Sequence, residues 1–266
     1  MTTATARAPL APGIAVTART VVLALMAALG IGAYVSFRPE QPWILVVTAF
    51  MAALGTDGLV KSHPRWAEEH RSADSLVYTF LPALGVLGSG LFIDHAIDGY
   101  GRQGFALVAA LTVGLVAFGE YQTVDTEGRL YGPFRVLMAV ATYLVAFSFF
   151  TVIYSRDFDL PFAGAFVAGV SALLAMELLR ESRITGPSSV LVGIAIGLTL
   201  GEFRLALYFF PLDGLLAGAL LLIAFYFATG IVHHLLDHDL DLTTAAEYVL
   251  VTGVAAAAVV AARLVA

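Results

Sequence analysis

The sequence contains no cysteine, which excludes disulfide bonds, iron–sulfur clusters and thiolate metal sites. Charged residues make up only 13% of the chain, about half of their usual share in a soluble domain. Basic residues number 14 against 20 acidic ones, and the net charge of −6 excludes nucleic-acid binding as the main role. Apolar residues reach 59%, more than the about 45–50% of soluble proteins. This composition predicts a membrane protein with several spans.

Nine apolar stretches are long enough, or nearly so, to cross the hydrocarbon core as helices, which takes about 20 residues. They run over 20–37, 43–60, 76–93, 104–119, 134–155, 161–180, 188–203, 211–236 and 244–264. None shows the alternation of apolar and polar residues that is typical of barrel strands. The predicted fold is therefore all-α, a polytopic transmembrane helix bundle of about nine spans, in which residues 20–266 form a single transmembrane domain.

Residues 1–19 contain arginine but no acid, and no cleavage site follows an apolar core. We expect them to form a disordered cytoplasmic tail before an uncleaved first span. Nine lysines and arginines fall on the side of the N-terminus and five on the other side. The excess of basic residues on cytoplasmic loops predicts a plasma-membrane protein with its N-terminus in the cytoplasm and its C-terminus outside.

A pattern of glycine, any residue and an aromatic residue, followed by a proline, occurs three times. The three copies begin at Gly32, Gly119 and Gly201. They divide the chain into units of three helices, 20–95, 104–181 and 187–264, of which the middle one must be inverted because each unit has an odd number of spans. Inverted repeats are common in transporters. The alternative is a chance alignment of helices with similar composition.

Small residues recur every fourth position in the seventh span, at Gly193, Gly197 and Gly201. Such a stripe lets a second helix approach closely in lipid, so we interpret it as a packing surface. A ligand groove is the alternative interpretation.

Four ionisable residues are candidates for buried ions or for transport: Glu202, Arg204, Glu120 and Asp57. Glu202 and Arg204 are two residues apart and cannot face each other on a helix, so each is expected to pair with another helix. Glu120 occupies the same place as Glu202 in the repeated pattern. Asp57 precedes Lys61 by four residues, which predicts an ion pair at the membrane interface, with a proton or ion site as the alternative.

Four charged residues cluster where the sixth span ends: Glu177, Arg180, Glu181 and Arg183. Charges at a helix end are usually hydrated, so we expect them to form a solvated ionic rim.

The histidines concentrate near the end of the eighth span, in the segment 233–241. His234 and His238 are one helical turn apart, and Asp237 lies between them. This spacing suits a divalent metal, although histidines also commonly stabilise the C-terminal end of a helix. We expect a helix end and no cofactor, with a divalent metal site as the alternative.

Residues 187–236 resemble a family of uncharacterised multi-pass bacterial membrane proteins. The resemblance rests on Gly201-Glu202-Phe203, on the turn from Tyr208 to Pro211 and on Phe225-Tyr226. It implies a bacterial source and no particular activity.

The candidate residues do not include a complete catalytic set, so a non-enzymatic role is favoured over catalysis. That role is an assembly or structural subunit, or a transporter-like protein for small solutes or ions. The alternative is an intramembrane metal-dependent enzyme that uses the cluster from His233 to His238. The expected partners are the lipid bilayer and either other membrane subunits or further copies of the chain, and no nucleic acid.

Overall fold

The computed structural model describes residues 12–37, 41–66, 74–156, 158–181, 187–210 and 212–265. These residues form nine long helices and two short 3-10 turns. The helices are α1 (Pro12–Phe37), α2 (Trp43–Val60), α4 (Val77–Ala96), α5 (Gly101–Gln122), α6 (Tyr131–Ser155), α7 (Leu160–Leu178), α8 (Pro187–Leu207), α9 (Gly214–Asp237) and α10 (Leu242–Val265), and the 3-10 turns are η1 (Asp74–Leu76) and η2 (Leu179–Glu181). All nine helices of the described segments are long and apolar enough to cross a membrane, which confirms the predicted all-helical fold and indicates a multi-pass membrane protein.

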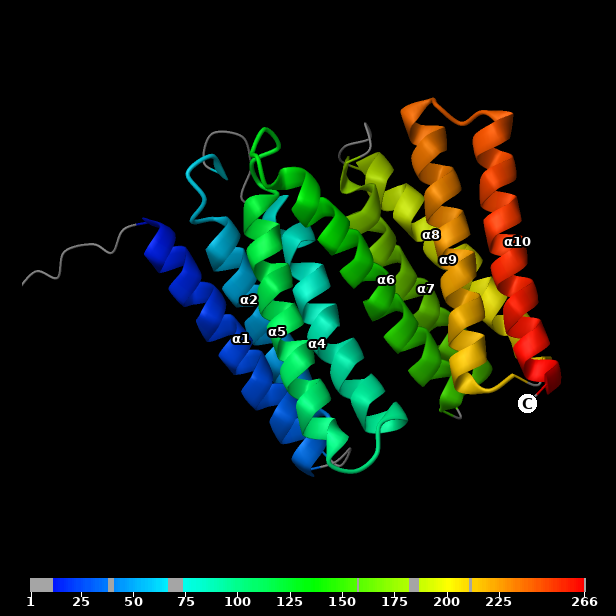
Figure 1. Cartoon of the computed structure of the whole chain (residues 1–266), viewed down its shortest axis with the longest axis horizontal. Helices are drawn as coiled ribbons and strands as arrows, with labels where there is room; N and C mark the ends of the chain where they lie inside the picture. The colour runs from blue at the N-terminus through cyan, green and yellow to red at the C-terminus, as the bar shows by residue number, and fades with distance from the viewer. Residues whose placement is uncertain are drawn as a thin grey trace, which may run out of the picture.

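The nine helices run up and down in alternation, so the bundle has two ends (Figure 1). We call the end where α1 begins the first face; α2, α5, α7 and α9 end there. The opposite end, where α10 ends, is the second face. The division into three repeated units stays a prediction.

Helix α1 begins at Pro12, so residues 12–19 are helical and do not belong to a disordered tail as predicted. A proline is well tolerated in the first turn of a helix, where its missing N–H is not needed. The early turns are also held by packing, because Val16 is buried in one cluster with Leu23, Leu59 and Ala117. Residues 1–11 lie outside the described segments.

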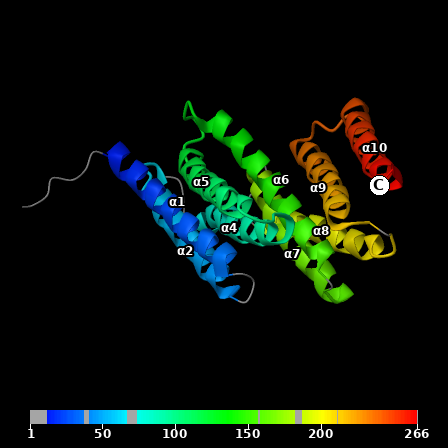
Figure 2. The same ribbon diagram turned by 60° about the horizontal axis from the view of Figure 1, so that its bottom comes forward.

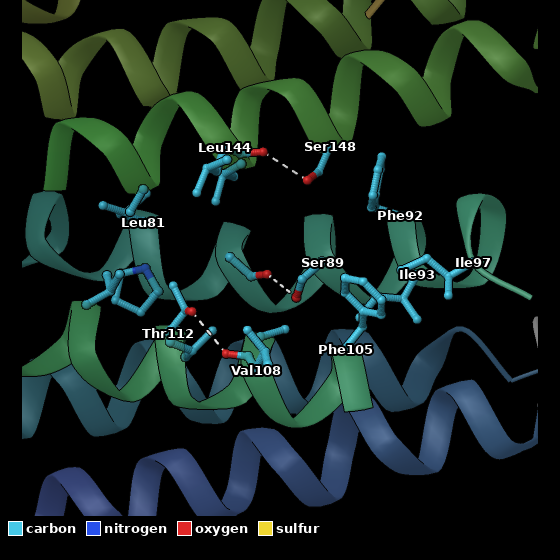
Figure 3. A pocket seen from close by; sticks show the side chains of 17 residues that line it. Leu81, Ser89, Phe92, Ile93, Ile97, Phe105, Val108, Thr112, Leu144 and Ser148 are labelled. Carbon is cyan, nitrogen blue, oxygen red and sulfur yellow. Dashed lines mark hydrogen bonds between the residues drawn. The ribbon is translucent and has the colours of Figure 1, made fainter. Parts of the chain in front are cut away.

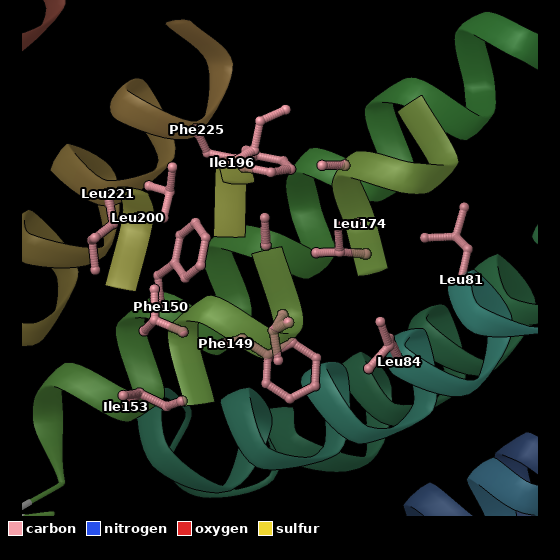
Figure 4. Close-up of a cluster of buried hydrophobic side chains, with 14 of the residues drawn as sticks. Leu81, Leu84, Phe149, Phe150, Ile153, Leu174, Ile196, Leu200, Leu221 and Phe225 are labelled. Carbon is pink, nitrogen blue, oxygen red and sulfur yellow. The ribbon is translucent and has the colours of Figure 1, made fainter. Parts of the chain in front are cut away.

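The helices form two groups with separate apolar cores (Figure 2). The N-terminal half contains α1, α2, α4 and α5, whose core includes Ile31, Leu45 and Val86. The C-terminal half contains α6 to α10, and Figure 4 shows its core around Phe150 and Phe225. Helix α4 contributes to both cores, because its early residues point toward α6 and α7. The seam between the halves therefore runs along α4, α5 and α6.

Helices α7 and α8 approach each other through small residues on both sides. A Cβ added at Gly201 would lie 2.8 Å from the carbonyl oxygen of Gly164, and one at Gly193 would lie 3.1 Å from that of Ala172. A Cβ at Gly197 would collide with the carbonyl oxygen of Ala168. The glycine stripe of α8 thus lies against the backbone of α7, whose own small residues recur at the same spacing of four.

The helices α9 and α10 begin at aspartates that cap them. An oxygen of Asp213 accepts a hydrogen bond from the backbone N–H of Leu216 at 2.8 Å, and one of Asp241 accepts from Thr244 at 2.7 Å. The bond from the Thr244 N–H lowers the pKa of Asp241 below its ordinary value. These caps fix where the last two spans start.

Candidate functional site

Four charged side chains meet near the first face. One comes from α5, and the other three come from α6, α7 and η2. Glu120 lies in the last turn of α5 and Arg135 near the start of α6, while Glu177 closes α7 and Arg180 lies on η2. Because these helices all have an end at the first face, their terminal turns come together there. We call this group the ion network.

Arg180 is the centre of the ion network. Its Nη1 lies 2.7 Å from Oε2 of Glu120 and 3.0 Å from Oε2 of Glu177. Its Nη2 donates a hydrogen bond to the hydroxyl of Thr123 at 2.9 Å, and its guanidinium lies 4.3 Å from the ring centroid of Tyr78. Arg180 therefore joins α5, α7 and α4 through one side chain.

Arg135 extends the ion network toward α6. Its Nη1 lies 3.1 Å from Oε1 of Glu177, and its Nη2 donates to the carbonyl oxygen of Leu178 at 3.4 Å. Glu177 is thus shared between two guanidinium groups. Two carboxylates and two guanidiniums give the ion network a net charge of zero when all four are ionised.

The ion network is buried, and the solvated rim expected at the end of the sixth span is not found for its described members. Glu177 is 1% exposed, and the side chain of Arg180 is 16% exposed. Burial opposes the charge on Arg180, but the carboxylates of Glu120 and Glu177 outweigh it and raise the pKa of the guanidinium. The end of α7 is buried because α7 packs against α6 and α4, and η2 is tied to α5 by the pair of Arg180 with Glu120. The side chain of Glu181 and the whole of Arg183 lie outside the described part.

Glu120 differs from the other members in having an unused oxygen. The residue is 0% exposed, and its Oε1 has no hydrogen-bond partner among the described residues. Only its Oε2 is neutralised, by Arg180. The repeated sequence pattern singled out Glu120 as a buried-ion candidate, but it did not identify Arg180 as the partner. The ionised form of Glu120 therefore depends on one side chain of a different element.

A pocket of about 260 Å³ with several polar side chains in a mainly apolar lining lies beside the ion network, between α6, η2, α9 and α10. Arg135 lines it together with His233 and Tyr248. Deeper in, the hydroxyls of Tyr143 and Thr229 lie 3.3 Å apart. Arg135 thus lies in both the ion network and the lining of this pocket.

The family of proteins of unknown function called DUF5656 matches residues 20–262. The chain belongs to this family. No match was found among curated proteins, and none among solved structures. The family description confirms an uncharacterised family and states neither a source nor a topology.

The other acid of the repeated pattern has a different environment in this DUF5656 protein. Glu202 lies within α8, is exposed, and forms no ion pair with a described residue, so the expected inter-helix pair is not found. Arg204 is 4% exposed, and its guanidinium lies 4.5 Å from the ring centroid of Tyr154. Its Nε and Nη1 have no hydrogen-bond partner in the described segments. Both residues lie toward the second face, far from the ion network along the helices.

Asp57 forms the ion pair that its spacing predicts in the DUF5656 chain. The Nζ atom of Lys61 lies 2.8 Å from Oδ2 of Asp57, and both side chains are partly exposed at the first face. This pair is a feature of the membrane interface, and among the described residues no ion pair joins it to the ion network.

The histidine segment of the DUF5656 protein does not gather its predicted metal ligands. His234 pairs with Asp239 at 2.9 Å, and His233 lies 3.5 Å from Asp237. His238 follows the last residue of α9 and has a left-handed backbone with a φ of 60°, so it leaves the helical face on which His234 lies. Over the described residues, no three histidine, aspartate or glutamate side chains are arranged to hold a metal ion.

Proposed function

We propose that this protein is a non-enzymatic, transporter-like protein of the bacterial plasma membrane that moves protons, alone or together with a small solute. The observation that carries the proposal is Glu120, an acid within a membrane span that is fully buried and paired through only one of its oxygens. Ionisable groups inside a membrane are costly, and they commonly mark ion and proton pathways.

The ion network supplies a simple link between proton uptake and a structural change. While Arg180 stays at 2.7 Å from Oε2, its charge favours the carboxylate form of Glu120. If Arg180 moves toward Glu177 alone, Glu120 is left in an apolar environment and must take up a proton, because an unpaired buried charge is very unfavourable. Each movement of η2 relative to α5 would therefore bind or release one proton at the first face.

The excess of lysine and arginine on the N-terminal side supports a first face that is cytoplasmic. In this orientation, the pocket lined by Arg135 and His233 lies in the cytoplasmic half of the bundle. The C-terminus is then external.

The proposal is tested by proton uptake into liposomes that contain the purified protein and an internal pH-sensitive dye. An imposed membrane potential should acidify vesicles with the wild-type protein, and Glu120→Gln should abolish the acidification while remaining folded. Glu127→Gln is the matched control, because Glu127 lies near the same face with an 81% exposed side chain and pairs only at the surface with Arg65. Wild-type vesicles that stay as proton-tight as empty ones would contradict the proposal.

A role as a subunit of a homo-oligomer is the second candidate, and α10 favours it. None of the apolar stretch from Leu242 to Leu264 is buried within the chain, and α10 packs mainly on α9. Since the chain has no cysteine, single cysteines can be introduced without background. Val254→Cys on α10 should give a cross-linked dimer in native membranes, and Leu29→Cys on α1 should not. Absence of a dimer at position 254 would argue against this role.

A further inference from the structure

An apolar groove of about 330 Å³ lies on the seam between the two halves of the bundle (Figure 3). Its walls come from α4, α5 and α6. In Figure 3, Leu81 lies at one end and Ile97 at the other. These two positions are separated by about 24 Å, at a rise of about 1.5 Å per residue, which is most of the roughly 30 Å thickness of the hydrocarbon core.

The polar atoms of the groove are already satisfied. The hydroxyls of Ser89, Thr112 and Ser148 donate hydrogen bonds to carbonyl oxygens of their own helices, at 2.6, 3.0 and 2.9 Å. The remaining lining is apolar except for backbone. A column of water or a polar solute would therefore find few partners there, whereas a hydrocarbon chain would fit the lining.

The groove is open toward the side of the bundle that faces lipid. Phe105, Val108 and Leu144 line it and are each more than half exposed. An apolar chain can therefore enter from the bilayer without crossing a polar surface.

Two arginines and two aspartates lie at the second-face end of the groove. Ile97 lines this end, and its carbonyl oxygen accepts a hydrogen bond of 2.6 Å from Nε of Arg102. Arg102 lies 3.6 Å and Arg156 3.5 Å from the two oxygens of Asp94, whose side chain is 8% exposed. Two guanidiniums thus share one buried carboxylate. Asp98 also lies 4.0 Å from Arg102 and is fully exposed, so the four side chains are together neutral. This end offers a phosphate the N–H donors of two partly exposed guanidiniums, whose side chains are 21% and 37% exposed.

We propose that the groove binds one chain of an anionic membrane phospholipid, whose phosphate lies at the second face beside Arg102 and Arg156. The apolar lining selects a hydrocarbon chain, and the lateral opening selects a molecule of the bilayer. The two partly exposed guanidiniums favour a phosphate without an attached cation, which is an anionic headgroup. This site is independent of the proposed proton transport, because Glu120 lies at the opposite end of the bundle.

The test is native mass spectrometry of the purified chain, titrated with phosphatidylglycerol or phosphatidylcholine with identical acyl chains. Wild-type protein should bind phosphatidylglycerol about tenfold more tightly, which corresponds to about 1.4 kcal/mol. Both lipids offer a phosphate, but the choline cation of phosphatidylcholine is repelled by the two guanidiniums. Glycerol phosphate, which carries the headgroup charge without a chain, should not bind. Equal affinity for the two lipids, or binding of glycerol phosphate, would overturn the proposal.

Two variants test the apolar groove and its charged end separately. Thr112→Phe fills the groove and should weaken both lipids at least tenfold, whereas Thr199→Phe is the matched control, because Thr199 is exposed on α8 and makes the same bond to its own helix at 2.9 Å. Arg156→Gln should remove the preference for phosphatidylglycerol and leave phosphatidylcholine binding unchanged.

Thermal melting checks that each variant is folded, and Ser148→Phe should act like Thr112→Phe. Equal effects of the phenylalanines at positions 112 and 199, or an unchanged lipid preference in Arg156→Gln, would contradict the assigned site.

Discussion

The ends of α5 and α8 carry the same short pattern, glycine then glutamate then an aromatic residue, and yet the two glutamates have opposite environments. Glu120 is fully buried and lies 2.7 Å from Arg180, whereas Glu202 is exposed and forms no ion pair with a described residue. The difference follows from the neighbours of each helix. Helix α5 is covered by α4, α6 and η2 at this level, so both Gly119 and Glu120 are buried.

Helix α8 is covered on the side of its glycine stripe. Gly201 faces α7 so closely that a Cβ would lie 2.8 Å from the carbonyl oxygen of Gly164. The next residue points about 100° away around the helix, which directs Glu202 off the contact surface. The same three-residue pattern therefore gives a buried ion or an exposed one, depending on how many helices surround it.

The largest loss of stability should come from removing Arg180, the cation that pairs with the buried Glu120. Arg180→Met leaves Glu120 buried without a counter-charge, and breaking a buried pair costs about 3–5 kcal/mol in the free energy of unfolding. Arg204→Met at the other end removes a buried guanidinium that has no acidic partner among the described residues, and loses mainly a cation–π contact of about 0.5–2 kcal/mol. Thermal melting in one detergent compares the two variants. Equal losses would mean that the ion network is not a coupled buried unit.

The comparison of the two acids is sharpened by Glu120→Gln and Glu202→Gln. The glutamine at position 120 keeps an acceptor for Arg180 but loses the charge, so we expect a loss of about 1.5–3 kcal/mol. The glutamine at position 202 should change stability by less than about 0.5 kcal/mol, because it is an exposed substitution. Melting temperatures measured at one pH give both values. A larger loss of stability for Glu202→Gln would show that a partner covers Glu202, which is exposed in the isolated chain.

The helices themselves were predictable because each apolar run carries its own signal over about 20 residues. All nine spans follow from it, whereas the start of α1 was placed too late, at residue 20, because the contact of Val16 with Leu59 and Ala117 is not visible in the local sequence. Helix ends depend on such tertiary contacts.

The site was only partly predictable. Glu120 could be singled out from the repeated pattern, but Glu177 and Arg180 were interpreted as hydrated because charges at the end of a span usually are. Their burial results from the packing of α7 against α6 and α4 and from the ion pair that ties η2 to α5, which are properties of the whole arrangement. The groove along α4 was likewise not predictable, since three separate helices have to be placed before it exists.

The close contact between α7 and α8 can be compared with α10, which lies at the edge of the bundle and packs mainly on α9. Gly197→Val places a side chain against the backbone of Ala168, so the helices must separate, at a cost of about 1–3 kcal/mol. Gly253→Val is the matched control on α10, where nothing lies within 4 Å of an added Cβ. Thermal melting should show a clear loss for Gly197→Val and almost none for Gly253→Val. A loss of similar size at Gly253 would indicate that α10 packs against a second molecule.

A small effect is expected for the ion pair that the sequence did predict. Asp57 and Lys61 lie 2.8 Å apart, but their side chains are 26% and 40% exposed, so water and salt screen their attraction. Asp57→Asn should lower stability by no more than about 1 kcal/mol, and the difference from wild type should shrink as the salt concentration rises. The loss for Glu120→Gln should be less sensitive to salt, because buried pairs are screened much less than exposed ones. Melting both variants at low and high salt therefore separates a surface pair from a buried network, and a salt-independent loss for Asp57→Asn would mean that Asp57 acts in a buried site after all.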